Sequence, residues 1–373
     1  MSKERFANLL YKHAILPVTS FDPEATHDLL FKVFSRFEKS DLFLKAVKQE
    51  FGIEDRKLVV EMMGIEFPSP ILLAAGIVKY GPGACIIAAM GAGGEDIGTF
   101  TFQKTDGNPK VETFPDGRKV KVKRIRRFPD GTIVNWMGLP NLGTEKGVEN
   151  IKNVQDKICK PFGFNLAPTP GLGDIESSVA DLRQSLEIVY RIHPSWNTLN
   201  LHCPNTLDSE KQKRIDEAVQ TMRGFAKAAD TIEARTGIII PKIAKIGPDM
   251  TPEDIKLIVL TAKECNFQAI KATNTTTDRT GEREKYAAYK GGLSGPLLFE
   301  RSLSTMEQVT KFDRELGGDP LVKIACGGIG SFDKLKKIQR AGADLFECAT
   351  PFIFGGPYFW KRMNRDYLNS FRI

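Results

Sequence analysis

The sequence predicts an α/β protein folded as a closed (β/α)8 barrel, or TIM barrel, preceded by a small helical extension. Eight short apolar runs recur along its 373 residues, and helix-like stretches separate most of them. The runs are uniformly apolar, which is typical of parallel strands buried on both faces of a sheet. Eight units favour closure into a barrel, and the alternative left open is a doubly wound open sheet. The predicted strands are Ile71–Gly76, Glu95–Thr99, Phe162–Leu166, Thr198–Cys203, Pro241–Ile246, Ala269–Thr275, Leu321–Gly327 and Leu345–Pro351.

The stretches between the strands carry signals for the start of a helix. Thr251 is followed by a proline and by the acidic residues Glu253 and Asp254, which suit an N-cap, a first helical position and a first turn. Ser331 and Asp333 likewise open a stretch that follows glycines. The predicted helices are Ile175–Ile192, Asp216–Thr236, Thr251–Cys265, Arg301–Leu316 and Ser331–Ala341.

Residues 1–60 lie outside the repeat and are predicted to form a helical extension before a barrel of residues 61–373. Two apolar stripes at helical spacing indicate short amphipathic helices. These helices either pack on the barrel or form a cap that admits an apolar substrate or touches a membrane surface. The stripes consist of Leu29, Leu30, Val33, Phe34 and Phe37, and of Leu42, Phe43, Ala46, Val47 and Phe51.

A basic insertion at about residues 100–150 separates the second and third predicted strands. Its basic residues alternate with Val120, Val122 and Ile125, and a period of two residues predicts hairpin strands. Basic residues in such a pattern are typical of a solvated sheet face, so we expect these residues to face solvent and not to form a binding patch. The basic residues are Lys119, Lys121, Lys123, Arg124, Arg126 and Arg127.

The composition narrows the classes of function. Hydrophobic residues make up 41% of the chain and charged residues 27%, which excludes a disordered or collagen-like chain. A net charge of +7 without a basic and aromatic array does not predict nucleic-acid binding. The six cysteines and four histidines show no metal-ligand spacing. Apolar runs far shorter than about 18 residues and the lack of a secretory signal predict an intracellular protein that does not span a bilayer.

Polar residues gather at the ends of the predicted strands, where barrel enzymes place their active sites. They are mainly amides, with two lysines, Lys79 and Lys245, and one thiol, Cys203, while carboxylates are nearly absent. Neutral amide donors and acceptors suit a ligand that is itself a cyclic amide or imide. Each asparagine taken alone is equally a turn residue. The candidate asparagines are Asn135, Asn165, Asn200, Asn205 and Asn274.

Glycine runs near the last two strands indicate a phosphate site. Gly327 and Gly328 follow the seventh predicted strand, and the eighth ends at Ala349 and Thr350. Loops at these places commonly bind phosphate in barrel enzymes through backbone N–H groups. Gly291–Gly295 is predicted to be a further flexible loop. We therefore expect a phosphate-bearing cofactor, and the first strand–helix turn lacks the G-x-G-x-x-G pattern of a dinucleotide fold.

Seven motifs together resemble those of the dihydroorotate dehydrogenases. They occur in family order between about residues 60 and 360 and so cover most of the chain. The resemblance implies an FMN-dependent barrel that oxidises dihydroorotate to orotate in the de novo biosynthesis of pyrimidines. The motifs are Ala75–Lys79, Glu95–Thr99, Asn135–Gly138, Asn200–Thr206, Thr273–Thr276, Gly291–Gly295 and Gly327–Ile329.

The start of the chain resembles the membrane-associated, quinone-reducing class of that family. Phe21–His27 followed by an amphipathic helix is similar to the start of that class, whose N-terminal helices form a hydrophobic tunnel to the flavin. Cys203 stands where that class has serine, Met137–Asn141 is similar to the soluble class, and Leu207–Ser209 replaces the family's Gly-Leu-Arg. The resemblance implies a quinone acceptor and peripheral contact with the cytoplasmic side of a membrane through the N-terminal helices. The alternatives are a soluble cytoplasmic enzyme with an acceptor such as fumarate, a related dihydropyrimidine oxidoreductase, or a non-catalytic flavin-binding protein.

The resemblance also implies roles for individual residues. Cys203 is predicted to take the C5 proton of dihydroorotate as hydride leaves C6 for the flavin, because a thiol is a better base at neutral pH than a serine hydroxyl. Its alternative role is that of a small buried apolar residue. Lys245 is predicted to lie at the pyrimidine edge of the flavin and Lys79 near flavin and substrate, the alternative for both being a salt bridge at the barrel rim. The predicted substrate contacts are Lys79, Asn135, Trp136, Met137, Gly138, Leu139, Asn200, Asn205, Asn274 and Thr275, and the predicted FMN contacts are Ala75, Gly76, Lys79, Thr99, Asn165, Asn200, Lys245, Thr273, Gly295, Gly328, Ala349 and Thr350.

Overall fold

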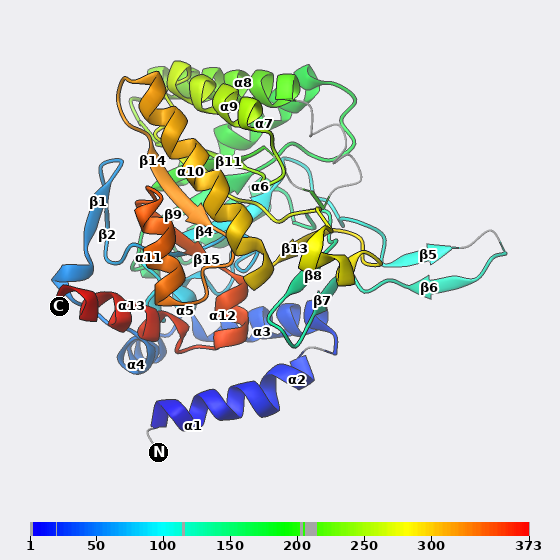
Figure 1. Ribbon diagram of the computed structural model, residues 1–373, viewed down its shortest axis with the longest axis vertical. Coiled ribbons are helices and arrows are strands. Elements are labelled where there is room, and N and C mark those ends of the chain that lie inside the picture. Colours follow the sequence, from blue (N-terminus) through cyan, green and yellow to red (C-terminus); the bar gives the residue numbers. More distant parts are fainter. Residues whose placement is uncertain (1–2, 20, 114–115, 202–203, 206–214, 373) are drawn as a thin grey trace.

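Eight parallel strands close into a barrel in the computed structural model, which describes residues 3–19, 21–113, 116–201, 204–205 and 215–372 (Figure 1). Each barrel strand pairs with the next one along the chain, and the last pairs back onto the first. This confirms the predicted (β/α)8 barrel and excludes the open sheet. The barrel strands are β3 (Ile71–Leu73), β4 (Glu95–Phe100), β9 (Phe162–Leu166), β10 (Trp196–Asn200), β11 (Lys242–Ile246), β12 (Ala269–Ala272), β14 (Val322–Cys326) and β15 (Leu345–Cys348).

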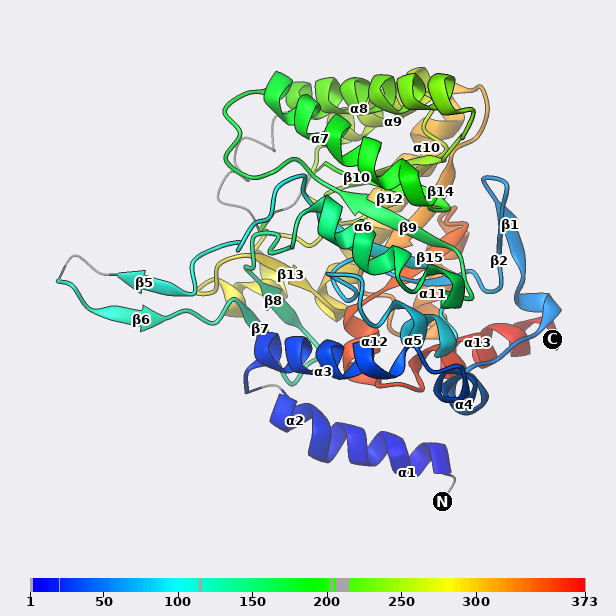
Figure 2. The same ribbon diagram turned by 180° about the vertical axis from the view of Figure 1, so that it is seen from behind.

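Helices cover the outside of the barrel, as the views from the front and from behind show (Figures 1 and 2). The five predicted helices are all present. In one of them the predicted start is confirmed in detail, because the Thr251 side chain accepts from the backbone N of Asp254 and the Asp254 side chain accepts from the backbone N of Thr251. The helices are α5 (Ala84–Ala89), α6 (Thr144–Lys152), α7 (Ile175–Val189), α8 (Ile215–Thr236), α9 (Pro252–Glu264), α10 (Phe299–Leu316), α11 (Phe332–Arg340), α12 (Thr350–Gly355) and α13 (Phe359–Asn369). Short 3-10 helices lie at Arg56–Leu58, Gln155–Lys157, Tyr190–Ile192, Gly281–Tyr286, Pro296–Leu298 and Ser370–Arg372.

Several strands end earlier than predicted. The run Leu345–Pro351 is a strand only as far as Cys348, and Thr350 already begins α12. A proline has no N–H to donate to a sheet, so Pro351 suits the first turn of a helix and not a central strand. Because these strands end early, residues that were predicted to lie in strands lie instead in the loops around the barrel mouth.

The amino end of the barrel is closed by apolar side chains. The hairpin of β1 (Val60–Met62) and β2 (Ile65–Phe67) packs against this end. The core cluster beneath it consists of Phe67, Leu72, Trp196, Ile243, Ala269, Ile324 and Leu345, all nearly inaccessible to solvent. Polar chemistry is therefore confined to the opposite, carboxyl end.

The N-terminal extension is largely helical, as predicted. The two apolar stripes form α3 (Pro23–Phe37) and α4 (Asp41–Phe51). Residues 3–19 belong to the predicted extension, although no individual helix was placed there, and consist of α1 (Lys3–Leu10), a π-helical turn (Tyr11–Ile15) and α2 (Leu16–Thr19). Both views place α1 and α2 at one end of the molecule, beyond α3 and α12 (Figures 1 and 2). Among the described residues, no helix is both long enough and apolar enough to cross a membrane.

The basic insertion forms two antiparallel hairpins, as predicted. The strands β5 (Val111–Thr113) and β6 (Lys119–Lys121) pair only with each other and project as an arm in both views (Figures 1 and 2). The strands β7 (Ile125–Arg127) and β8 (Ile133–Asn135) form the second hairpin, and β13 (Gly292–Ser294) joins it through β8. The arm is exposed, whereas the second hairpin lies against the barrel mouth.

Two expectations about this region were wrong. Arg124 does not lie on a solvated face but is 3% exposed, because its guanidinium binds Glu24 of α3 and the carbonyl oxygens of the insertion itself. Arg127 likewise lines an internal cavity. Gly291–Gly295 is not a flexible loop, since Gly292 belongs to β13 and packs so closely that a Cβ there would lie 1.9 Å from Oγ1 of Thr275.

Candidate active site

A cavity of about 650 Å³ lies at the carboxyl ends of the barrel strands and continues to the N-terminal helices. Its inner end is formed by strand ends and by the loops that follow them. Its outer end is formed by α3, the π-helical turn and α12. One continuous space therefore joins the interior of the barrel to the N-terminal extension.

Most of the predicted site residues line this cavity. Trp136 and Asn165 are not among the lining residues. The Trp136 ring instead packs beneath the ammonium of Lys290, 5.1 Å from the ring centroid. Asn165 is fully buried and accepts a hydrogen bond from Thr99. Cys203 lies outside the described residues, so its role stays a prediction. The predicted residues that line the cavity are Ala75, Gly76, Lys79, Thr99, Asn135, Met137, Gly138, Leu139, Asn200, Asn205, Lys245, Thr273, Asn274, Thr275, Gly295, Gly328, Ala349 and Thr350.

Hydrogen bonds join the amides at the inner end across the strands. Asn274 Nδ2 donates to Asn200 Oδ1 at 2.9 Å, and Asn200 Nδ2 donates to Thr99 Oγ1 at 3.3 Å. Thr99 in turn donates to Asn165 Oδ1 at 2.6 Å. Each bond fixes which end of an amide is the donor, so the polar groups facing the cavity have preset orientations.

Asn205 is held by a residue that the sequence reading missed. Nδ2 of Asn108, in the basic insertion, donates to the carbonyl oxygens of Asn205 at 2.7 Å and of Trp136 at 3.0 Å. The side-chain oxygen of Asn205 accepts from the backbone N of Gly292 at 2.6 Å. The signal for Asn108 was only the turn sequence Gly107–Pro109 inside a segment read as solvated.

Lys79 places a positive charge in the wall of the cavity. It is 6% exposed, and its Nζ lies 3.6 Å from Sδ of Met137, a weak acceptor. Burial of the ammonium lowers the pKa of Lys79 to about 8, although the carboxylates of Asp28 and Glu24 on α3 oppose the shift. Among the residues that the structure describes, no carboxylate forms an ion pair with Lys79, and a buried cation of this kind favours an anionic ligand.

Carboxylates are nearly absent from the cavity lining, as predicted, but two acidic residues at the inner end were not singled out in the sequence. Glu347 lines the cavity, and Asp96 lies fully buried below it. Nζ of Lys245 lies 4.0 Å from Oε2 of Glu347, beyond hydrogen-bond distance, and therefore keeps donors for a ligand. The overlooked signal was an acidic residue inside an apolar strand, in Glu95–Ile97 and in Phe346–Cys348.

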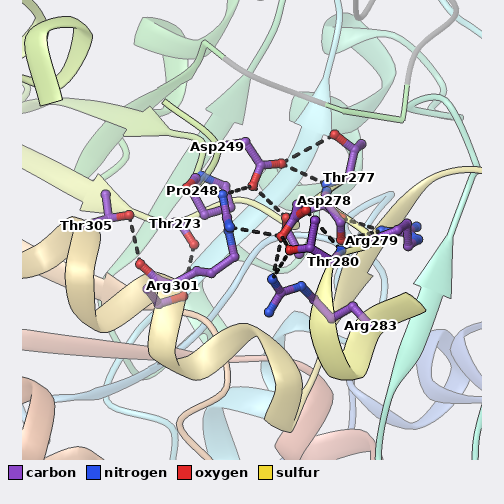
Figure 3. Close-up of polar contacts among 12 residues, drawn as sticks. Pro248, Asp249, Thr273, Thr277, Asp278, Arg279, Thr280, Arg283, Arg301 and Thr305 are labelled. Atoms are coloured by element: carbon purple, nitrogen blue, oxygen red, sulfur yellow. Dashed lines mark hydrogen bonds and ion pairs between the residues drawn. The ribbon is translucent and has the colours of Figure 1, made fainter. Parts of the chain in front are cut away.

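A polar network fixes the loop that follows β12, as Figure 3 shows. Asp249 accepts from the backbone N of Thr277 at 2.8 Å and pairs with Arg301 of α10 at 2.9 Å. Arg301 also pairs with Asp278 at 3.0 Å. Thr273–Thr275 connect β12 to this network, which therefore anchors the segment that contacts the cavity.

The inner end has features that suit a planar, phosphate-bearing cofactor. Gly76 has φ of +101°, and no atom lies within 4 Å of where its Cβ would stand, so a ring can approach the backbone there. Oγ1 of Thr275 is buried without a hydrogen-bond partner in the described part of the chain. Gly295, Gly327–Gly328 and Ala349–Thr350 line the side where we expect the phosphate. No cluster of metal-binding side chains occurs among the residues that the structure describes.

The outer end of the cavity is mainly apolar but contains several polar side chains. Tyr11 donates its hydroxyl to the carbonyl oxygen of Ile353 at 2.6 Å, and Arg127 Nη1 donates to Thr19 Oγ1 at 3.1 Å. Burial lowers the pKa of His27, so its imidazole is neutral at physiological pH. The apolar lining includes Ile15, Leu30, Phe31, Phe34, Phe352 and Ile353.

Comparison with known proteins finds relatives that match nearly the whole chain. The family model for dihydroorotate dehydrogenase matches residues 57–370. A protein of Acinetobacter baumannii described as dihydroorotate dehydrogenase (quinone) is 31% identical over 95% of this chain and 98% of its own length. A Vibrio parahaemolyticus protein with the same description is 33% identical over 94% of this chain and 97% of its own length. The crystal structure of DHODH from Eimeria tenella in complex with ferulenol matches with a TM-score of 0.78 and 25% identity, covering 94% of this chain and 91% of that one.

Proposed function

This chain belongs to the dihydroorotate dehydrogenase family, and from that premise we propose that it oxidises dihydroorotate to orotate in pyrimidine biosynthesis, with FMN as cofactor and a quinone as acceptor. The relatives described as quinone enzymes align over almost the full chain, which supports both the reaction and the acceptor. The observation that carries the proposal is the continuous cavity, polar at its inner end and apolar at its outer end. Such a cavity accommodates a polar dihydropyrimidine and an apolar quinone on the same cofactor.

The inner amides hold the substrate ring in this proposal. Asn200 and Asn274 present groups whose orientations are already fixed, and Asn135 and Asn205 line the same space. Donors and acceptors of this kind match the N–H and C=O groups of a dihydropyrimidine. Lys79 supplies the positive charge for the substrate carboxylate and, with a pKa of about 8, is mostly protonated at neutral pH.

Cys203 is the base that removes the C5 proton. A thiol reaches its thiolate form much closer to neutral pH than a hydroxyl does, which favours proton transfer. Its chain neighbours Pro204 and Asn205 line the cavity, which supports the assignment.

Bound FMN supplies the hydride acceptor, and the protein supplies its position. Lys245, which makes no hydrogen bond of its ammonium within the described part of the chain, offers donors and a positive charge where negative charge develops on reduction. Gly76 and Thr99 would lie against the ring, and Asn165 would act through Thr99. The backbone of Gly295, Gly328, Ala349 and Thr350 would hold the phosphate.

The N-terminal helices admit the quinone from a membrane surface. Of the 17 exposed large apolar side chains among the described residues, 11 lie within residues 6–42. An apolar concentration of this kind suits an interfacial contact, in which helices lie on a bilayer without crossing it. We therefore place the protein as a peripheral protein on the cytoplasmic side of a membrane.

An acceptor panel tests this function. The visible spectrum of the purified protein is recorded first, and dihydroorotate oxidation is then assayed with ubiquinone, menaquinone, fumarate and NAD. We expect a bound-flavin spectrum and turnover with a quinone. Turnover with fumarate alone would overturn the acceptor, and a colourless protein without turnover would overturn the enzyme.

A further inference from the structure

Four charged side chains form one layer of the barrel interior, between the apolar amino end and the cavity. This charge layer consists of Asp96, Lys245, Lys271 and Glu347, from β4, β11, β12 and β15, and each is at most 5% exposed. Nζ of Lys271 lies 2.8 Å from Oδ2 of Asp96 and 2.5 Å from Oε1 of Glu347. Two cations and two anions in one closed layer give a formal balance of zero.

Only half of the charge layer reaches the cavity. Lys245 and Glu347 line it, whereas Lys271 and Asp96 are fully buried and do not. Lys271 therefore cannot bind a ligand in the cavity directly. Its described partners are the two carboxylates and Oγ1 of Thr198, to which it donates at 3.2 Å.

Lys271 favours the ionised form of Glu347. Burial raises the pKa of Glu347, and the charge of Lys271 opposes that shift. Burial alone would lower the pKa of Lys271, but the charges of Asp96 and Glu347 outweigh it and raise the pKa above its ordinary value. Lys271 thus keeps its positive charge, and together with the more distant Lys245 it offsets the carboxylate of Glu347.

We propose that Lys271, through its ion pair with Glu347, sets the reduction potential of the flavin held in the cavity. Reduction adds negative charge to the flavin, so an uncompensated anion nearby opposes it and an uncompensated cation favours it. The four side chains are at most 5% exposed, so their charges are poorly screened by salt. Lys271 is a positioning residue that acts on the flavin through Glu347, and this inference rests on the proposed binding of FMN.

The test measures the flavin midpoint potential of the full-length holoprotein by anaerobic dye-coupled titration at pH 8. Glu347→Gln removes an anion and should favour reduction at least tenfold, a rise of about 30 mV for a two-electron couple. Lys271→Met removes a cation and should disfavour reduction by a similar factor. The double variant restores the balance and should return to within threefold of the wild type.

The midpoint potential should shift in opposite directions in Glu347→Gln and Lys271→Met. A merely structural role of these residues would not produce that pattern. Cys326→Ser, a change without formal charge at another cavity-lining strand residue, is the matched control and should leave the potential unchanged. If Lys271→Met does not fold, the comparison of Glu347→Gln with the double variant still tests the inference. Adding Lys271→Met to Glu347→Gln should lower the midpoint potential that Glu347→Gln raised. Shifts of the same sign, or shifts below threefold with flavin bound, overturn the inference alone. Wild-type protein that binds no flavin overturns the proposed function together with it.

Discussion

The two ends of the cavity are built in different ways. At the inner end, Thr99 of β4, Asn200 of β10 and Asn274 in the loop after β12 are linked by hydrogen bonds within the barrel. At the outer end, the π-helical turn and α2 reach the rest of the molecule through isolated bonds such as that of Tyr11 to Ile353. The inner end therefore positions the groups that react with the substrate, while the outer end controls which molecules enter the cavity. The two half-reactions should be separable by mutation.

The largest expected effect falls on the inner end. Replacing Cys203 with alanine removes the proposed base, so reduction of the flavin by dihydroorotate should slow by about 10²–10⁴-fold. Stopped-flow absorbance under anaerobic conditions measures this half-reaction. Quinone reoxidation of chemically reduced protein, which belongs to the outer end, should stay unchanged. Unaltered flavin reduction in this variant would remove Cys203 from the mechanism.

A charge placed at the outer end should give the converse pattern. Leu30 lines the cavity, so Leu30→Glu puts a carboxylate in an apolar passage and should lower the rate of quinone reduction about tenfold or more. Leu29, the next residue, is 66% exposed and is not a lining residue. Leu29→Glu should therefore leave turnover with a short-chain, water-soluble quinone intact. Equal losses in both variants, or a loss of dihydroorotate-dependent flavin reduction, would contradict the division between the two ends.

Lys79 gives the inner end a pH dependence. Its pKa of about 8 means that the ammonium, protonated below pH 8, loses its charge as the pH rises through that value. The dissociation constant of orotate, which is anionic, should be flat below pH 8 and rise up to tenfold per pH unit above it. Titration of the flavin spectrum with orotate between pH 6.5 and 9.5 measures this. The slope should disappear in Lys79→Met and persist in Lys110→Met, a substitution of an exposed lysine that pairs with Glu24.

The smallest effect concerns the contact that joins the two ends. Glu24 of α3 binds the buried Arg124, so Glu24→Gln should lower the free energy of unfolding by about 1–3 kcal/mol in urea titrations at pH 7. Burial raises the pKa of Glu24, but hydrogen bonds from Arg124 and Lys110 outweigh it and lower the pKa below its ordinary value. The contribution is thus present above the unfolded pKa of Glu24 and is lost as the pH falls through the folded pKa. The difference in the free energy of unfolding between Glu24→Gln and the wild type should therefore shrink as the pH falls below the ordinary pKa of a glutamate. Lys121→Met, which removes an exposed pair with Asp22, should cause no measurable change.

The barrel was predictable because its strands are periodic in the sequence. Each apolar run gave a strand, and residues at the strand ends, such as Asn200 and Lys245, met in one cavity for the same reason. Asn108 and Arg124 were not predictable, since their burial depends on contacts with segments about 100 residues away. Glu347 was missed because an acidic residue inside an apolar strand shows only that an acid is buried, and not which cation it pairs with.

The β5–β6 arm has a practical consequence. Its two strands pair only with each other, and the three residues of β6 are all exposed. A lone two-stranded hairpin with no core beneath it is the least stable kind of sheet and opens independently of the rest of a protein. The arm is therefore a place where the chain tolerates a cut, an inserted tag or a shortened turn. Engineering of this protein for immobilisation or crystallisation should begin there.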